Sequence, residues 1–188
     1  MTIRDSKMLP DLLRPGLDVV FVGINPSVYS AERGHYFARP SNRFWPCFSV
    51  SVLSREARSA FGVARLLPEH DRALLEFGIG FTDVVKRATP KASDVASNEF
   101  KAGVRRLVAT LEVHAPRIAC FHGVTGFRPV HRALTGATAA LELGLQSLTL
   151  GPTHLYVVPN PSGANAHFRR EDQTDWYDRL ADWLAQKS

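Results

Sequence analysis

The sequence has few cysteines and no cluster of residues typical of a metal site. Cys47 and Cys120 are the two thiols among 188 residues, too few for a four-cysteine zinc or iron–sulfur centre. Each stands in an apolar run, which favours a buried and unreactive thiol. The seven histidines show no tight ligand spacing. We therefore expect no metal site.

The sequence also lacks a long hydrophobic run. No apolar stretch is long enough to cross a bilayer, and the mixed, charged N-terminal segment has no apolar core of a secretory signal. We expect a cytoplasmic protein. The glycine-rich patterns of nucleotide sites, the Walker-type loop and G-x-G-x-x-G, are absent too, so we expect no cofactor. Without repeats or linkers, residues 1–188 are expected to form a single domain.

Acidic residues are in the minority. Lysine and arginine number 23 against 18 aspartates and glutamates, a formal net charge of +5. This excess favours a polyanionic partner, although charge alone leaves the choice of partner open.

Apolar, β-rich runs predict strands at residues 18–24, 117–123 and 154–160, and a weaker one at 145–151. Helical periodicity appears at 41–53, 97–116 and 171–188, and Ser97 is a candidate N-cap for the second of these helices. Alternating strands and helices predict an α/β fold, with a mainly parallel sheet between two helical layers.

Two of the predicted strands end in the same tripeptide. Asn25-Pro26-Ser27 follows the first strand, and Asn160-Pro161-Ser162 follows the last. One such end would be read as a turn, since Asn and Pro are common turn residues. Ligands of open α/β sheets bind beyond the carboxyl ends of the strands. Two matching ends therefore indicate a site.

Four blocks together resemble one known family. They are GINPS with FARPSNRFW (23–27 and 37–45), GFTDVVKRATPKASDVASNEF (80–100), PRIACFHG (116–123) and VVPNPSGANAHF (157–168). In this order they resemble the mismatch-specific uracil-DNA and thymine-DNA glycosylases of the uracil-DNA glycosylase superfamily. The resemblance implies the three-layer α/β/α fold of that superfamily and hydrolysis of the N-glycosidic bond of a damaged base flipped out of DNA.

The first motif gives the candidate residues for chemistry. A carboxamide at Asn25 can bind a base edge or a water, but it cannot act as a general base. Faster relatives carry aspartate there, so the resemblance implies slow chemistry that depends on stabilising the leaving base. Backbone N–H groups around Ile24, Asn25 and Phe37 are candidates for binding the developing negative charge.

Base selection is assigned to three side chains by the resemblance. Ser27 stands where stringent uracil enzymes carry a tyrosine that excludes the thymine methyl group and where closer relatives carry glycine, so a broad base range is expected. Phe37 matches the aromatic residue that stacks on the flipped base. Asn160 stands where uracil-specific enzymes use histidine, and it is the weaker donor.

The second motif is expected to contact DNA. Ser162 and the backbone of Gly163 can donate to phosphate oxygens. Relatives insert a bulky wedge after this glycine, whereas Ala164 and Asn165 follow here, so Asn165, His167 or Phe168 must fill the gap or the product is held weakly. Arg169 is a candidate phosphate contact or a solvated residue at a helix start.

Three further titratable residues stand near strand or helix ends. Asp94, in the loop before a helix, could activate the attacking water that Asn25 cannot deprotonate, or it could simply begin the helix. Asp83 is a second carboxylate candidate, near the mouth of the site. His122 ends the third strand, and we interpret it as structural.

The sequence thus predicts a monofunctional DNA glycosylase, probing double-stranded DNA as a monomer without metal or cofactor. Neither motif carries a lysine that would form a Schiff base. Two alternatives stay open: an N-glycosidase of free nucleosides or nucleotides, and a non-catalytic module that binds damaged DNA.

Overall fold

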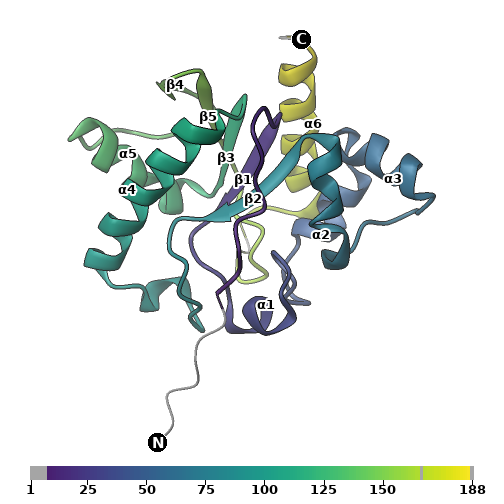
Figure 1. Ribbon diagram of the computed structural model, residues 1–188, viewed down its shortest axis with the longest axis horizontal. Helices are drawn as coiled ribbons and strands as arrows, with labels where there is room; N and C mark the ends of the chain where they lie inside the picture. The colour runs from purple at the N-terminus through teal and green to yellow at the C-terminus, as the bar shows by residue number, and fades with distance from the viewer. Residues whose placement is uncertain (1–7, 166, 187–188) are drawn as a thin grey trace, which may run out of the picture.

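The computed structural model describes residues 8–165 and 167–186, which form a five-stranded sheet between two layers of helices (Figure 1). The strands are β1 (Val19–Gly23), β2 (Ile79–Asp83), β3 (Ile118–His122), β4 (Gly144–Leu150) and β5 (Thr153–Val158). Their order is β2-β1-β3-β5-β4, with β4 antiparallel to β5 and the other pairs parallel. The predicted three-layer α/β/α fold is confirmed.

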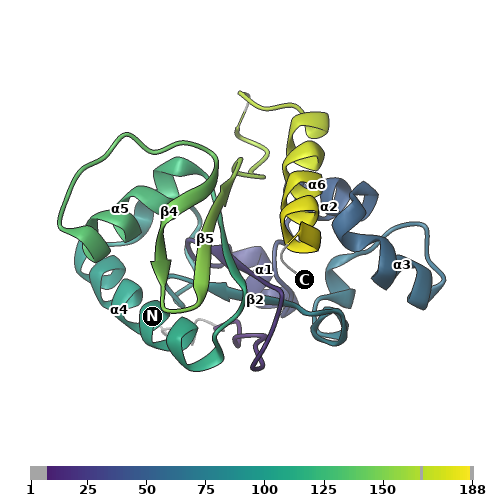
Figure 2. The same cartoon turned by 90° about the horizontal axis from the view of Figure 1, so that it is seen from above.

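Helices α4 (Ser97–His114) and α5 (Val124–Thr135) cover one face of the sheet (Figure 2). Helices α2 (Phe44–Val50), α3 (Arg55–Phe61) and α6 (Arg170–Gln186) lie on the other side. The short α1 (Val28–Arg33) lies beyond the carboxyl end of β1 (Figure 1). Four 3-10 turns complete the connections: Val52–Ser54, Pro68–His70, Ala73–Phe77 and Ala92–Asp94.

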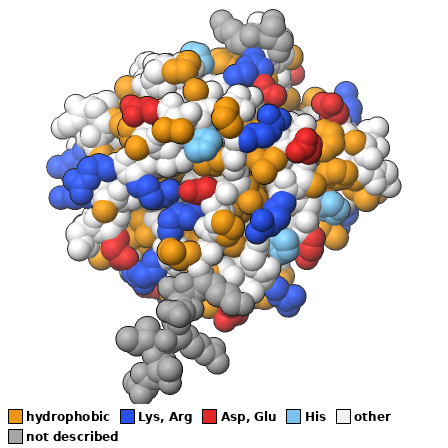
Figure 3. Space-filling view, viewed as in Figure 1, with side chains coloured by type: hydrophobic (Ala, Val, Ile, Leu, Met, Phe, Trp, Pro, Cys, Tyr) orange, Lys and Arg blue, Asp and Glu red, His pale blue; other side chains and the backbone are white. Residues whose placement is uncertain are grey.

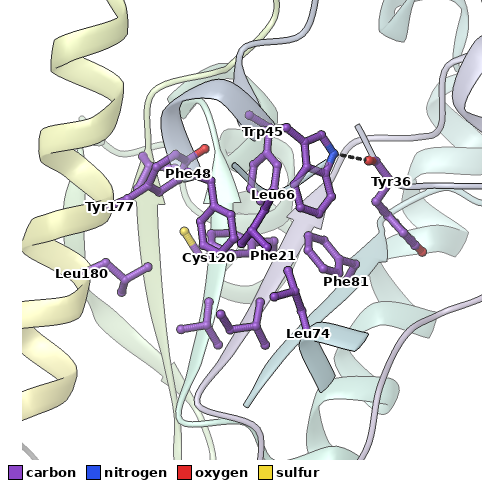
Figure 4. Packing of buried hydrophobic residues seen from close by; sticks show 14 of the residues in the cluster. Phe21, Tyr36, Trp45, Phe48, Leu66, Leu74, Phe81, Cys120, Tyr177 and Leu180 are labelled. Carbon is purple, nitrogen blue, oxygen red and sulfur yellow. Dashed lines mark hydrogen bonds between the residues drawn. The ribbon is translucent and has the colours of Figure 1, made fainter. Parts of the chain in front are cut away.

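Alternation along β1 divides the core in two. Phe21 points to the α2 and α6 side, where its ring lies 5.0 Å from Phe44 and 5.8 Å from Tyr177 (Figure 4). Val20 and Val22 point to the other side and belong to the cluster that includes Leu107 and Phe127. Successive side chains of a strand face opposite layers, so a strand buried on both faces is apolar throughout.

Strand β2 was not predicted, because glycines at 78 and 80 interrupt its apolar run. The fold explains Gly80: a Cβ there would lie 2.5 Å from the carbonyl oxygen of Leu12. Leu12 pairs with Phe81 through two backbone hydrogen bonds of 2.9 Å, so the N-terminal segment covers the outer edge of β2. Covering an edge in this way blocks pairing with another chain.

The predicted N-cap of α4 is displaced by one residue. Ala96, not Ser97, is the cap residue, and its N–H donates to the Glu99 carboxylate at 3.1 Å. Cys47 and Cys120 are both buried and unpaired, as expected. Burial raises the pKa of the Cys120 thiol well above its ordinary value.

The surface carries mixed charge. On the face shown in Figure 3, lysine and arginine side chains are interspersed with acidic and hydrophobic ones and form no continuous basic patch. Of the helices in residues 8–165 and 167–186, none combines the length and the hydropathy needed to cross a membrane.

Candidate functional site

A cavity of about 490 Å³ opens beyond the carboxyl ends of four parallel strands. The residues at these ends are Asn25 after β1, Asp83 ending β2, His122 ending β3 and Asn160 after β5. Parallel strands bring their carboxyl ends to one edge of the sheet, which is why segments far apart in the sequence meet here. The other lining residues are Leu9, Gly23, Ile24, Pro26, Ser27, Ser30, Tyr36, Phe37, Arg39, Asn42, Thr89, Pro90, Lys91, Ala92, Pro161, Ser162 and Ala164.

The carboxamide nitrogen of Asn25 is used within the protein. Nδ2 lies 2.7 Å from Oγ1 of Thr89, 3.0 Å from the carbonyl oxygen of Arg87 and 3.2 Å from that of Pro26. The Thr89 hydroxyl in turn donates to the carbonyl oxygen of Lys91 at 2.6 Å. Asn25 therefore fixes the loop after β2 against the end of β1, and its Oδ1 is the polar atom left for a ligand.

The side chain of Ile24 packs against α5. A Cβ on Gly126 of α5 would lie 3.0 Å from Cδ1 of Ile24, so the isoleucine packs against that helix. Its carbonyl oxygen accepts from the N–H of Val85 at 2.8 Å. Ile24 is also among the residues that line the cavity.

Ser27 lines the cavity and also caps α1. Its Oγ accepts from the N–H of Ser30 at 3.1 Å and donates to Oγ of Ser30 at 3.0 Å. The Ser30 hydroxyl accepts from the N–H of Ala38 at 3.1 Å. This pair of serines connects the first motif to the loop that carries Phe37, and it draws the Ser27 hydroxyl into the helix cap.

Phe37 is held in an unusual backbone conformation. Its φ of 53° lies in the left-handed region, which costs a non-glycine residue about 1–2 kcal/mol. The ring stacks on Phe44 with centroids 4.6 Å apart and meets the edge of His122 at 5.1 Å. The strained turn thus places an aromatic ring at the cavity with one side supported by the core.

Two buried titratable side chains line the cavity, and neither forms an ion pair with a described residue. Asp83 is 2% exposed, and its Oδ2 has no hydrogen-bond partner among the described residues. Burial raises the pKa of Asp83 to about 7. His122 is 5% exposed and lies with Nε2 at 3.2 Å from the Tyr177 hydroxyl. Burial lowers the pKa of His122 to about 3, an effect that the backbone of Val22 only partly offsets. The imidazole is therefore neutral near pH 7.

Asn160 begins a compact loop. Its Oδ1 accepts from the N–H of Ser162 at 2.9 Å, and its carbonyl oxygen accepts from Nδ2 of Asn165 at 2.9 Å. The Asn165 side chain also accepts from the N–H of His167 at 3.2 Å. With Oδ1 occupied, the amide nitrogen of Asn160 is the group that remains to donate to a ligand.

The structure gives the DNA-contact candidates different exposures. Gly163, Ala164 and His167 are exposed, whereas Ser162 and Asn165 are partly buried within the loop. Gly163 packs closely, since a Cβ there would lie 2.4 Å from the carbonyl oxygen of Ser41. Arg169 is exposed and forms an ion pair of 3.1 Å with Asp172 in the first turn of α6. Asn165 is thus committed to loop structure, while the exposed His167 packs its ring edge-on against Phe168, with the centroids 4.8 Å apart.

Arg43 stands at the start of α2 and also holds the second motif. Its guanidinium donates to three carbonyl oxygens of the 160–168 loop: Phe168 at 2.6 Å, Ser162 at 3.1 Å, and Asn165. The Arg43 N–H also donates to the carbonyl oxygen of Pro161 at 2.8 Å. One side chain therefore holds the second motif against the start of α2.

Asp94 lies outside the cavity lining. It is exposed, at the end of the 3-10 turn Ala92–Asp94, and its Oδ2 accepts from the N–H of Lys91 at 3.0 Å. The structure therefore does not bring Asp94 together with Asn25, and Asp83 is the carboxyl group that it does bring to the cavity. Within the described part of the chain, no group of three histidine, cysteine, aspartate or glutamate side chains is arranged to hold a metal ion.

Several functional candidates escaped sequence reasoning. Thr89 and Arg43 act through hydrogen bonds to residues 64 and more than 100 positions away. The need for glycine at position 23 becomes visible only in the folded structure, since a Cβ there would lie 2.2 Å from Oδ1 of Asp83. No local pattern could have identified these partners.

Comparison with known proteins identifies the family of this chain. The model of the Uracil DNA glycosylase superfamily matches residues 10–185, which include both Asn-Pro-Ser motifs. The solution NMR structure of a Methanosarcina acetivorans protein, named as a candidate uracil DNA glycosylase, is similar in fold with a TM-score of 0.54. The two chains are 21% identical, and the match covers 94% of this chain and 98% of the other. Since the family match spans nearly the whole sequence, the chain belongs to the uracil DNA glycosylase superfamily.

Proposed function

We propose that this chain is a monofunctional, mismatch-specific DNA glycosylase that removes uracil and related pyrimidines from DNA, above all opposite guanine. The observation that carries the proposal is the cavity in which both Asn-Pro-Ser motifs meet Phe37. Water adds to the anomeric carbon of the deoxyribose, the bond to the base nitrogen breaks, and the base leaves with the bonding electrons and takes up a proton. An abasic site remains in the DNA.

The base would stack on Phe37, whose ring is held by Phe44 and His122. Stacking of a base on an aromatic ring contributes about 1–3 kcal/mol and tolerates different bases. The neighbouring amide groups of the loop are already used, since Tyr36 N–H donates to Asp71 and Ala38 N–H to Ser30. The N–H of Phe37 between them is then the backbone donor for the departing base.

Asn25 would orient the water rather than deprotonate it. Its Nδ2 is fixed by Thr89, Arg87 and Pro26, so Oδ1 has a defined position at the cavity. An amide oxygen accepts a hydrogen bond from water but is far too weak a base to take its proton. Catalysis then depends on stabilising the leaving base, and we expect slow turnover.

A broad base range follows from the position of Ser27. Its hydroxyl is drawn into the cap of α1, so the residue adds little bulk at the cavity. We infer that 5-substituted uracils fit. Ser27→Tyr should keep uracil release and lose 5-substituted substrates, while Ser27→Gly, which also loses the cap, should keep both.

The proposal is tested by single-turnover assays on end-labelled duplexes carrying U opposite G, U opposite A and T opposite G, and on single-stranded U. Release that is fastest for U opposite G supports the proposal. Equal rates opposite G and A would contradict mismatch specificity. Tight, salt-sensitive binding without release from any substrate would favour the non-catalytic DNA-binding module.

Two controls address the remaining alternatives. Release of uracil from free deoxyuridine at the duplex rate would favour a nucleoside N-glycosidase. Trapping of a protein–DNA adduct by borohydride would contradict monofunctional hydrolysis. In that case the exposed Lys91, which lines the cavity, would be the candidate amine, and Lys91→Arg would test it by removing that amine.

A further inference from the structure

The buried carboxyl group of Asp83 lies where a side chain on Gly23 would otherwise be. The two residues are paired across β1 and β2, and a Cβ on Gly23 would lie 2.2 Å from Oδ1 of Asp83 and 3.7 Å from Cε1 of Phe37. Glycine at the end of β1 therefore gives the carboxyl group its room beside the stacking ring. The Asp83 side chain lines the cavity, with Oδ2 unpartnered among the described residues.

Among the described residues, no cation forms an ion pair with this carboxyl group. Lys86, in the loop after β2, and Arg106, on α4, both form ion pairs with Asp11, at 2.7 and 3.2 Å. Arg106 also donates to the backbone oxygen of Asp83, not to its side chain. These two cations are thus engaged by Asp11 of the N-terminal segment, and their charge only partly offsets the effect of burial on the pKa of Asp83.

The other titratable neighbours are neutral. Tyr36 donates its hydroxyl to the carbonyl oxygen of Pro10 at 3.1 Å, and burial together with Asp83 raises its pKa. His122, across β1 on β3, is neutral near pH 7. Strand β1 itself, Val19–Gly23, contributes no titratable group. An ionised Asp83 would be a buried charge without a partner, which is strongly disfavoured.

A neutral carboxylic acid offers one donor and one acceptor side by side, as a carboxamide does. The imide edge of uracil offers the complementary pair, an N–H next to a carbonyl oxygen. An ionised carboxylate would instead oppose that oxygen and the negative charge that develops on the departing base. The protonation state of Asp83 would thus decide how well the cavity binds the reacting base.

We propose that Asp83 recognises the imide edge of the flipped base as a neutral carboxylic acid and supports its departure by donating a hydrogen bond. This inference rests on the proposed function and adds a substrate class: bases with an adjacent N–H and carbonyl. It also distinguishes Asp83 from a general base, which would have to be ionised to act and would favour alkaline pH.

The test is a pH profile of single-turnover uracil release from a U:G duplex. Since the pKa of Asp83 is raised to about 7, the neutral fraction and the wild-type rate should fall about tenfold between pH 6 and pH 8. Asp83→Asn keeps a donor and an acceptor but cannot ionise, so it should flatten this profile and exceed wild type at pH 8. Asp182→Asn, the same change at an exposed site on α6, should keep the wild-type profile.

Two outcomes would overturn the proposal. A wild-type rate that rises with pH, together with loss of release in Asp83→Asn at every pH, would make Asp83 a general base. Profiles of wild type and Asp83→Asn with the same shape would show that Asp83 does not act on the base.

A binding measurement separates this proposal from the proposed function. Duplexes carrying deoxyuridine with fluorine at the sugar 2′ position resist hydrolysis, so binding is read without chemistry. The affinity of wild type for this duplex, measured relative to its affinity for a fully paired duplex, should weaken from pH 6 to pH 8. The same relative affinity of Asp83→Asn should not change. If this holds while no substrate is hydrolysed, catalysis is wrong and base recognition by Asp83 stands. If the affinities of wild type and Asp83→Asn change with pH in the same way, the inference is overturned.

Discussion

Nδ2 of Asn25 lies 2.7 Å from Oγ1 of Thr89, a contact between residues 64 positions apart in the sequence. The hydrogen bond joins the end of β1 to the loop after β2, and both residues line the cavity. The amide thereby acquires a fixed orientation, with its nitrogen toward the protein. Most of what the first motif can do chemically follows from this orientation.

Removing the hydroxyl of Thr89 should slow catalysis. Thr89→Val keeps the shape but takes away the acceptor of Asn25 and the donor to Lys91. A lost buried hydrogen bond costs about 1–3 kcal/mol, so single-turnover release should fall about tenfold or more. Thr89→Ser keeps the hydroxyl and should stay near wild type. Equal rates in the two variants would show that the orientation of Asn25 does not depend on Thr89.

Replacing Asn25 by aspartate should not yield a faster enzyme. In this fold Nδ2 faces the carbonyl oxygens of Arg87 and Pro26, and a carboxylate oxygen there would be repelled by both. We expect Asn25→Asp to lower the free energy of unfolding by about 1–3 kcal/mol and to leave the rate of uracil release no higher than wild type. An accelerated rate with unchanged stability would contradict the observed role of the amide.

Arg43 should be needed to hold the 160–168 loop, which we propose contacts DNA. Arg43→Lys keeps the charge but cannot donate to the three carbonyl oxygens of Phe168, Ser162 and Asn165 at once. We expect the dissociation constant for a U:G duplex to rise about tenfold, an energy of about 1.4 kcal/mol. Arg179→Lys, an exposed change on α6, is the matched control. Identical DNA affinities for the two variants would remove Arg43 from the binding loop.

The stability of the protein should depend on Asp83 in a pH range set by its raised pKa. Between the ordinary value of 3.8 and about 7, the folded protein keeps a proton on Asp83 that the unfolded chain has lost. This contribution to stability is complete below 3.8 and is lost as pH rises through 7, at about 1.4 kcal/mol per pH unit. Asp83→Asn should therefore be more stable than wild type at pH 8, with a gain that shrinks toward pH 4.

The contribution of His122 to stability changes with pH in the opposite direction. Its pKa is lowered from 6.5 to about 3, so the unfolded chain binds a proton that the folded protein refuses. Stability from this group is present above 6.5 and lost as pH falls toward 3. The two effects oppose each other in mildly acidic solution. Chemical denaturation should therefore show that the free energy of unfolding of Asp83→Asn falls more steeply with decreasing pH than that of wild type. An unchanged pH dependence would mean that Asp83 is ionised in the folded protein.

The sequence was sufficient for the fold class and for the sheet edge at which the candidate cavity lies. Apolar runs identified β1, β3 and β5, and the Asn-Pro-Ser ends indicated the edge at which the cavity opens. Strand β2 was missed because Gly78 and Gly80 disrupt its pattern. Gly78 ends the turn Ala73–Phe77 with a left-handed φ of 72°, and a Cβ on Gly80 would lie 2.5 Å from the carbonyl oxygen of Leu12. Close approach between segments distant in sequence leaves no periodic signal.

The roles of individual side chains were harder to predict. Asp83 and Asp94 stand in the same sequence block, and nothing local tells which one faces the cavity. The fold decides it: β2 carries Asp83 into the sheet beside Gly23, while Asp94 lies on an exposed turn. Arg43 similarly looks like a helix-start residue until the second motif folds against it.

The most direct test of the account is detection of the free base. Wild type and Asn25→Ala, each in excess over a U:G duplex at about pH 6.5, where Asp83 is mostly neutral, would be followed by mass spectrometry of released uracil. The account predicts one uracil per duplex from wild type and a rate at least about a hundredfold lower for Asn25→Ala, a loss of about 2.7 kcal/mol. No free uracil from wild type, or equal rates in the two proteins, would contradict it.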